Sequence, residues 1–219
     1  MSQDSSLVNA VATAAASDKA PKTERGRRTM RKLLDAAALE FGERGFHEAS
    51  IAGLTTRAGV SIGSFYVYFD SKEAIFRALV FDMGHMTRAW IAERVKDAPD
   101  RLAVERLGIA AFIEFVRAHK DLYRIVMESQ FVAADAYRAY YDTWAESYGR
   151  NLVLAAQKGE IRDGDQEKRT WAMLGMSVFL GMRYGVWSDT EDATTIADVA
   201  VDLLERGLLP EKSKPEKPR

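Results

Sequence analysis

The stretch from 51 to 69 constrains the fold of this chain most, because it has the pattern of two short helices joined by a tight turn. Ser50 is a natural N-cap for the first helix, since its hydroxyl can accept a hydrogen bond from a free first-turn amide. Ile51 and Leu54 follow at the spacing of one apolar helix face. Gly59 is expected to end this helix, because glycine most easily takes the left-handed conformation.

A second, very short helix is expected to start after Ser61 and to carry Phe65 and Phe69 on one face, both in the core. A helix, a short turn with glycine and a second helix form the helix-turn-helix pattern of DNA-binding proteins. Gly63 and Ser64 are small residues near the start of the second helix. They allow its N-terminal end to approach base edges in a major groove.

Residues 59–75 read Gly-Val-Ser-Ile-Gly-Ser-Phe-Tyr-Val-Tyr-Phe-Asp-Ser-Lys-Glu-Ala-Ile and resemble the signature of the tetracycline-repressor (TetR) family of transcription regulators. The similarity covers about residues 24–76, and the Tyr-x-Tyr-Phe-x-Ser-Lys-Glu run after the turn is specific. Many family members carry lysine or a polar residue where this chain has Ile62, and histidine or another polar group at Val67. The expected base-reading helix is therefore unusually apolar.

The resemblance implies that Tyr66 and Lys72 contact backbone phosphates. Tyr68 cannot share a helix face with Tyr66, so one hydroxyl can reach a phosphate while the other ring packs inward. Ile62 or Val67 can touch a thymine methyl group. The expected DNA-binding residues are Arg27, Arg28, Ser50, Arg57, Ser61, Ile62, Gly63, Ser64, Tyr66, Val67, Tyr68 and Lys72.

The formal net charge of −1 hides a local basic patch ahead of this motif. From Pro21 to Lys32 six residues are basic, and only Glu24 is acidic. Alone, such a run is usually a solvated face. Beside a helix-turn-helix it is the footprint expected of a surface that binds phosphates.

Composition excludes several classes of function. The chain has no cysteine, which excludes disulfides, thiol catalysis and Cys-ligated zinc. His47, His85 and His119 lack metal-ligand spacing, and no motif for a catalytic triad, phosphate loop or carboxylate pair stands out. We expect no enzyme activity, no cofactor and no metal. No apolar run approaches the ~20 residues that span a bilayer, so we expect a cytoplasmic protein without a membrane partner.

Four segments are expected: a disordered arm over 1–22, the DNA-binding domain over 23–69, a helical effector-binding and dimerisation domain over 70–209, and a disordered tail over 210–219. The first helix is expected to end at Arg44 with Gly45 as its stop. Beyond residue 70 the periodicity is helical throughout, with helices expected over about 71–95, 102–117, 121–131, 135–157, 166–187 and 194–208. The fold class is all-α with about nine helices, the count that the resemblance implies.

The larger domain is rich in aromatic residues and methionine, most of which must be core, although such residues also line pockets for apolar ligands. Arg183 and Asn151 are the favoured polar anchors and Arg124 a third, although an ion pair is an alternative for each arginine. The expected pocket residues are Phe112, Phe115, Tyr123, Arg124, Met127, Phe131, Tyr141, Trp144, Asn151, Trp171, Phe179 and Arg183.

A stripe of small residues, Ser177, Gly181 and Gly185, recurs at a spacing of four. Small residues in register permit close approach of another helix, and the resemblance implies dimerisation through the last two helices. We therefore predict a dimer seam here, with packing inside the chain as the alternative.

Together these features favour a homodimeric repressor that binds a palindromic DNA operator and is released by a small apolar effector. An acyl thioester or an aromatic acid is the candidate effector. Two alternatives stay open: a ligand-independent DNA-binding regulator or activator, and a helical small-molecule carrier.

Overall fold

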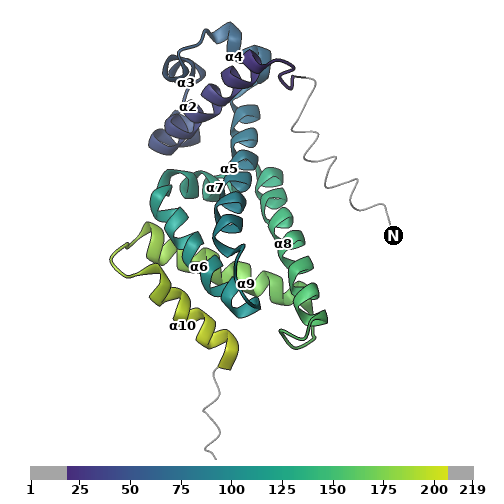
Figure 1. Cartoon of the computed structure of the whole chain (residues 1–219). Coiled ribbons are helices and arrows are strands. Elements are labelled where there is room, and N and C mark those ends of the chain that lie inside the picture. Colours follow the sequence, from purple (N-terminus) through teal and green to yellow (C-terminus); the bar gives the residue numbers. More distant parts are fainter. Residues whose placement is uncertain (1–18, 207–219) are drawn as a thin grey trace, which may run out of the picture.

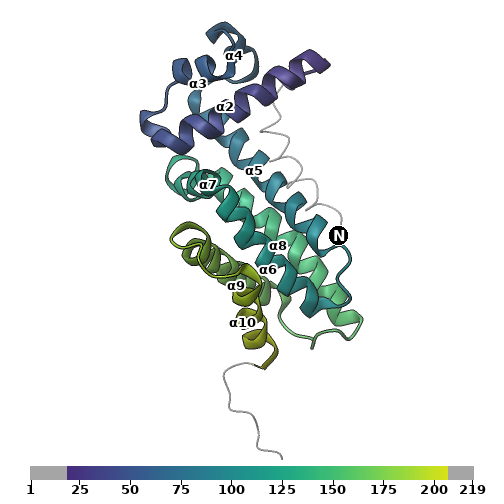
Figure 2. The ribbon, with the colours of Figure 1, turned by 60° about the vertical axis from the view of Figure 1, so that its left-hand side comes forward.

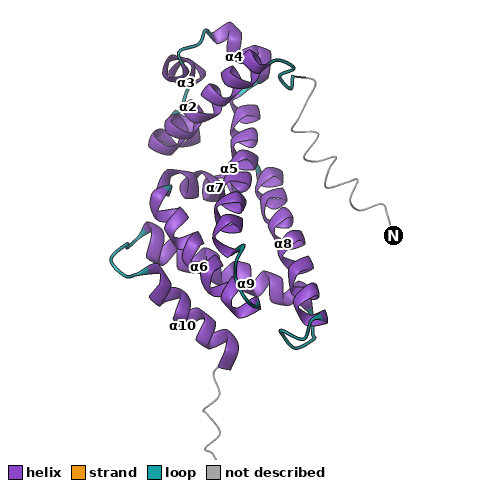
Figure 3. Cartoon of the chain, in the orientation of Figure 1, coloured by secondary structure: helices purple, strands orange, loops and turns teal. Residues whose placement is uncertain are grey.

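The computed structural model describes residues 19–206, and every regular element within them is a helix (Figure 3). This agrees with the expected all-α fold and with the count of nine α-helices. The predicted arm falls outside the described residues as far as residue 18, and the predicted tail falls outside them entirely. The elements are α2 (Glu24–Glu48), α3 (Ile51–Ala58), α4 (Ile62–Tyr68), α5 (Lys72–Val95), α6 (Arg101–Ala118), α7 (Lys120–Val132), α8 (Ala134–Gln157), α9 (Gln166–Gly181), the π-helical turn η1 (Met182–Val186) and α10 (Ala193–Arg206).

Helices α2 to α4 form a small head at one end, and α5 runs from that head into a body made of α6 to α10 (Figures 1 and 2). In both views α7 lies directly beneath α2, and the two helices pack against each other. Buried residues form one continuous core from Phe41 and Phe65 in the head to Ile125 and Tyr140 in the body. The head is therefore seated on the body, and the domain boundary at residues 69–70 stays a prediction.

Helix starts follow the expected capping chemistry, in which a side-chain oxygen accepts from a free amide of the first turn. The residues that cap in this way are Thr23, Ser50, Ser61, Ser71, Asp100, Asp165 and Asp192. The predicted stop at Gly45 is also confirmed. Gly45 has a φ of 73°, which breaks α2 before its last short turn.

The predicted helix over 166–187 is interrupted near its end. After Gly181 the chain widens into η1, where the amide of Trp187 donates to the carbonyl of Met182 over 3.0 Å. This hydrogen bond spans five residues, one more than in an α-helix. Periodicity alone predicts one unbroken α-helix here and misses the wide turn.

The prediction that Gly181 and Gly185 form the dimer seam is wrong, because both glycines are buried against α6 of the same chain. A Cβ atom on Gly181 would lie 2.6 Å from the ring of Phe112, and one on Gly185 would lie 2.6 Å from Val116. Ser177, the third residue of the stripe, lines an internal cavity. The small residues do allow close helix approach, but the helix that approaches is α6.

Candidate nucleic-acid interface and ligand pocket

The turn between α3 and α4 has the geometry that the sequence predicts. Gly59 is left-handed, with φ 64° and ψ 37°. Its amide donates to Thr56 over 3.2 Å, and the amide of Val60 donates to Thr55 over 3.1 Å. This pair of hydrogen bonds is a Schellman motif, which satisfies the last carbonyls of α3. The turn thus fixes the angle between α3 and α4.

Helix α4 buries one face and exposes the other. Phe65 and Phe69 are buried, as predicted. Ile62 and Val67 are exposed, Val67 by 61%, and a Cβ on Gly63 would meet nothing closer than 3.9 Å. An exposed apolar surface on this helix suits contact with thymine methyl groups. Contact of these residues with bases stays a prediction.

The two tyrosines of α4 point in different directions, as expected from their spacing. Tyr66 is exposed, whereas Tyr68 is half-buried, with its hydroxyl beside Gly26 at the start of α2. Lys19 donates to the carbonyl of Tyr66 over 3.0 Å and pairs with Asp70. The basic start of α2 therefore lies next to α4, and a duplex at α4 would also face it.

Within this basic start, Arg27 and Arg28 are exposed and share Glu24 as a partner at 2.9 Å and 3.3 Å. Exposed pairs of this kind are weak and can exchange a carboxylate for a phosphate. Arg31 differs, because it bridges α2 to α5 through Asp82 at 2.7 Å. Arg27 and Arg28 therefore remain available for DNA, while Arg31 has a structural role.

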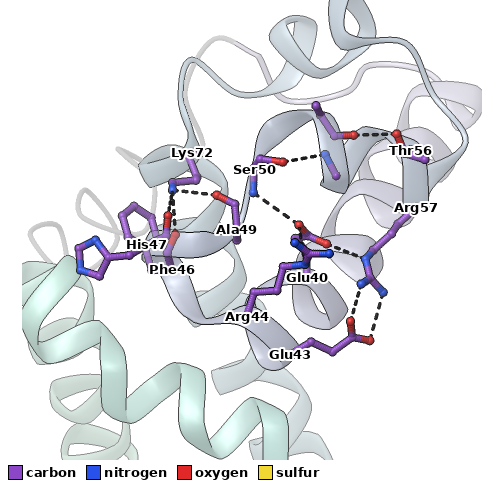
Figure 4. A network of polar contacts seen from close by, with 12 residues as sticks. Glu40, Glu43, Arg44, Phe46, His47, Ala49, Ser50, Thr56, Arg57 and Lys72 are labelled. Carbon is purple, nitrogen blue, oxygen red and sulfur yellow. Dashed lines mark hydrogen bonds and ion pairs between the residues drawn. The ribbon is translucent and has the colours of Figure 1, made fainter.

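Figure 4 shows why Arg57 does not point freely outward. Its Nε atom pairs with Glu40 over 2.7 Å, and its other nitrogens donate to Glu43. Glu40 is only 2% exposed and also accepts weakly from Arg44 and the amide of Ser50, both at 3.5 Å. Arg57 thus belongs to an ion-pair network that joins α3 to α2, and its contact with DNA stays a prediction.

Lys72 has a similar internal role. Its ammonium group donates to the carbonyls of Phe46 at 2.8 Å, His47 at 3.2 Å and Ala49 at 2.9 Å (Figure 4). An ammonium group has three N–H donors, and these three carbonyls account for all of them. Lys72 therefore holds the segment between α2 and α3 in this structure, and its contact with a phosphate stays a prediction.

The body contains a cavity of about 280 Å³ enclosed by α5 to α9. Its walls are mostly apolar, and the exposed residues Ala92 and Asn151 mark where it reaches solvent between α5 and α8. The expected pocket residues that line it are Phe112, Phe115, Tyr123, Met127, Tyr141, Trp144 and Asn151.

Five expected pocket residues lie elsewhere. Phe131, Trp171 and Phe179 are exposed, Phe131 by 84% and Phe179 by 67%. Arg183 is exposed and lies 5.0 Å over the ring of Tyr184. Arg124 donates to the carbonyl of Gly42 in α2 over 3.1 Å. Helical periodicity identifies the apolar faces but not which of them is covered.

Most of the polar residues that line the cavity are not among the expected pocket residues. At one end, Arg101 and Glu105 form a buried ion pair at 2.6 Å, and the hydroxyl of Tyr148 donates to Glu105. Burial alone would lower the pKa of Arg101, but Glu105 and Tyr148 offset it and the pKa is raised. Burial also raises the pKa of Tyr148. The i, i+4 spacing of Arg101 and Glu105 was the only signal of this pair in the sequence.

Arg88 also lines the cavity and has no carboxylate partner. It lies 5.9 Å over the Trp144 ring, and within residues 19–206 it makes no hydrogen bond or ion pair. Burial lowers the pKa of Arg88, and a nearby Tyr140 only partly opposes this. Nothing in the sequence distinguishes Arg88 from an exposed helix arginine.

Helix α7 joins the cavity to the head. One face carries Tyr123, whose hydroxyl donates to Val178 over 2.9 Å and whose pKa is raised by burial to about 12. On the α2 side, Arg124 holds the carbonyl of Gly42, and Glu128 accepts from the amide of Phe46 over 2.9 Å. A shift of α7 would therefore act on both the cavity and the end of α2.

Two kinds of feature are absent from the part of the chain that the structure describes. Among residues 19–206 no helix is long and apolar enough to cross a membrane. The same residues contain no cluster of three or more histidine, aspartate or glutamate side chains placed to hold a metal ion.

Comparison with known proteins gives the following relatives. The family described as bacterial regulatory proteins, tetR family, matches residues 33–79. YdgC of Bacillus subtilis (strain 168), an uncharacterised HTH-type transcriptional regulator, is 30% identical over 191 residues, covering 85% of this chain and 95% of YdgC. The HTH-type transcriptional regulator BetI of Klebsiella pneumoniae (strain 342) is 36% identical over 132 residues, covering 60% of this chain and 62% of BetI.

Solved structures show the same fold. FadR from Bacillus subtilis, crystallised in complex with stearoyl-CoA, superposes with a TM-score of 0.71 at 20% identity, covering 82% of this chain and 99% of FadR. FadR from Bacillus halodurans, a fatty acid degradation regulator, gives a TM-score of 0.70 at 20% identity, covering 82% and 96%.

Proposed function

The chain belongs to the TetR family of bacterial transcription regulators, and we propose that it is a homodimeric repressor released from its operator by a small apolar ligand. Members of this family regulate transcription and are not enzymes. The observation that carries the ligand-responsive part is the position of α7, which lines the cavity with one face and holds α2 with the other. Because its proposed target is operator DNA, we propose that the protein acts in the cytoplasm.

The proposed mechanism is a shift between two arrangements of the head. A ligand that binds one arrangement better shifts the equilibrium toward it, by no more than its difference in affinity for the two. In the released arrangement the two heads of the dimer no longer match half-sites one helical turn apart. Titrating the full chain onto operator DNA with and without candidate ligands tests this mechanism. If no ligand that binds the cavity changes the affinity for operator DNA, the ligand-independent alternative is favoured.

The effector class follows from the walls of the cavity. Its apolar lining suits an acyl chain or an aromatic ring, and FadR, which shares the fold, was crystallised with stearoyl-CoA. An acyl thioester and an aromatic acid therefore both remain candidates. A carrier function is less well supported, because the head has a complete turn, exposed α4 face and basic flank that transport does not need.

We propose that the dimer forms through the outward face of α9 and the adjoining face of α10. Trp171 and Phe179 on α9 are exposed, as are Val199 and Leu203 on α10. Exposed apolar residues that cluster on neighbouring helices are typical of a protein–protein interface. The second copy of this chain is the proposed occupant, as expected for a regulator whose operator is an inverted repeat.

Phe179→Glu is expected to give monomers at concentrations where the wild type is dimeric, because it places a charge in an apolar interface. Gly181→Ala serves as the control. Its Cβ would lie 2.6 Å from Phe112 within the chain, so it should lower the free energy of unfolding by about 1–3 kcal/mol and leave the dimer intact. Sedimentation velocity distinguishes the two. A Phe179→Glu variant that dimerises normally would place the interface elsewhere.

Operator binding is expected to weaken steeply with salt, with a log–log slope of about −0.9 for each phosphate neutralised. Arg28→Ala should reduce affinity on all sequences and flatten this slope by about one unit. Arg138→Ala, an exposed change on α8 in the body, is the matched control and should leave the slope unchanged. Fluorescence anisotropy at several salt concentrations provides the slopes. Equal slopes for Arg28→Ala and the wild type would remove Arg28 from the interface.

A further inference from the structure

The charges that line the cavity do not balance. Arg101 is neutralised by Glu105, which also accepts from Tyr148, so the charge at that end of the cavity is compensated even though the Arg101 Nη2 atom makes no hydrogen bond. Arg88 is the remaining charged residue of the lining, and it makes no hydrogen bond or ion pair within residues 19–206. The cavity therefore carries one uncompensated positive charge. A half-buried guanidinium group has five N–H donors that cannot be removed by deprotonation.

A second donor lies beside Arg88. The indole Nε1 of Trp144 is buried and lacks a well-aligned acceptor, although the Tyr140 hydroxyl lies beside it. The Arg88 guanidinium lies over the ring of this same tryptophan, at 5.9 Å. Buried donors are nearly always paired in folded proteins. The Tyr140 hydroxyl, which lies close to both groups, is neutral and cannot compensate the charge of Arg88, so a charged acceptor is missing. Both residues line the cavity, which places the missing acceptor inside it.

The size of the cavity limits the ligand. Its volume of about 280 Å³ is near the lower end for small-molecule sites. At roughly 15–30 Å³ for each non-hydrogen atom, between the probe volume and the liquid share of one water molecule, this is room for about ten to twenty such atoms. An eight-carbon fatty acid or a phenyl-substituted acetic acid has that size. The nucleotide part of a coenzyme A thioester does not fit inside.

We infer that the cavity binds a small amphipathic carboxylate, with its two oxygens held by the Arg88 guanidinium and the Trp144 indole N–H and its apolar part against the aromatic walls. A carboxylate supplies two acceptors and the matching charge, and charge-assisted hydrogen bonds are the strong ones. A thioester carbonyl supplies one neutral acceptor. This inference rests on the proposed ligand-responsive function and narrows its effector from an acid or a thioester to an acid.

Calorimetric titration of the full-length protein tests the inference, with octanoate, phenylacetate, methyl octanoate, 1-octanol and octanoyl-CoA as probes. At least one acid should bind about tenfold more tightly than the neutral methyl ester and the alcohol, the gain expected from a charged hydrogen bond. Comparing the affinities for octanoate and phenylacetate shows whether the cavity prefers an aliphatic or an aromatic ligand. Arg88→Met should lose about tenfold in affinity for the acid and nothing for the neutral probes.

Two further variants control for folding and for general charge. Trp144→Phe keeps an aromatic ring and removes only the N–H, so it should lose about three- to tenfold for the acid. Arg138→Met removes an exposed charge on α8 outside the cavity and should bind the acid like the wild type.

Three results would overturn the inference. Methyl octanoate could bind as tightly as the acid, the Arg88→Met variant could retain full affinity for the acid, or neither acid could bind at millimolar concentration. Tighter octanoyl-CoA binding that is indifferent to Arg88→Met would instead favour a thioester. Operator release is measured separately. An acid that binds through Arg88 but leaves operator affinity unchanged sustains this inference and counts against the proposed function.

Discussion

Replacing Glu40 by alanine is expected to lower the free energy of unfolding by about 1–3 kcal/mol, the cost of removing one partner from a hydrogen-bonded charge network. Glu40 is 2% exposed and holds Arg57 at 2.7 Å, with Arg44 and the amide of Ser50 nearby. Without it, the guanidinium of Arg57 keeps only Glu43, and the amide of Ser50 loses a weak acceptor. The angle between α2 and α3 then becomes less fixed, so operator affinity should also fall.

Glu43→Ala is the matched control, because Glu43 binds the same arginine from the surface. Its side chain is 52% exposed, and exposed pairs contribute only about 0–1 kcal/mol. Urea unfolding measures the free energy of unfolding of both variants, and equal m-values allow the two values to be compared directly. If Glu40→Ala costs no more than Glu43→Ala, the buried network does not hold the head together, and the position of α3 must depend on apolar packing alone.

The second large effect is expected at the contact between α7 and α2. The double variant Arg124→Ala, Glu128→Ala removes the hydrogen bonds to the carbonyl of Gly42 and the amide of Phe46. Neither residue lines the cavity, so ligand affinity in the absence of DNA should change little. Allosteric coupling of this kind typically changes affinity about 5- to 150-fold. We expect the double variant to lose most of that ligand effect on operator binding.

The control variant is Arg77→Ala, which breaks an exposed ion pair between α5 and α8 and leaves the α2–α7 contact intact. It should respond to ligand as the wild type does. The measurement is the ratio of operator affinities with and without saturating ligand, together with ligand affinity from calorimetry. A double variant with a wild-type ratio would show that the signal reaches the head by another route, for which the continuous helix α5 is the candidate.

Local chemistry made the head predictable from the sequence. The cap at Ser50, the left-handed Gly59 and the buried Phe65 each follow from a residue and its near neighbours, and the structure has all three. The same reasoning placed most helix ends within a few residues. The intrachain contacts of Arg57 and Lys72 were missed because their partners lie on other elements. Glu40 and the carbonyl of Ala49 cannot be recognised as neighbours from spacing alone.

The body was harder, because all of its helices have apolar faces and the sequence does not say which faces meet. Trp171 and Phe179 were expected in the cavity but face outward, whereas Gly181, expected at the dimer seam, is covered by α6. Arg88 lacked any local signal. Its significance depends on an absent partner, and only a three-dimensional arrangement can show that absence.

The wide turn η1 changes the angular phase of the chain that follows it. Each residue of an α-helix turns by about 100°, so Trp187, eight positions after Phe179, would point about 80° away from it. The π turn takes up one extra residue, so Trp187 stands where a seventh residue would, within about 20° of Phe179. Both rings are exposed, by 67% and 68%. The turn therefore lengthens the apolar ridge of α9 in a straight line, whereas the same residues in an unbroken α-helix would place Trp187 about 80° off that ridge.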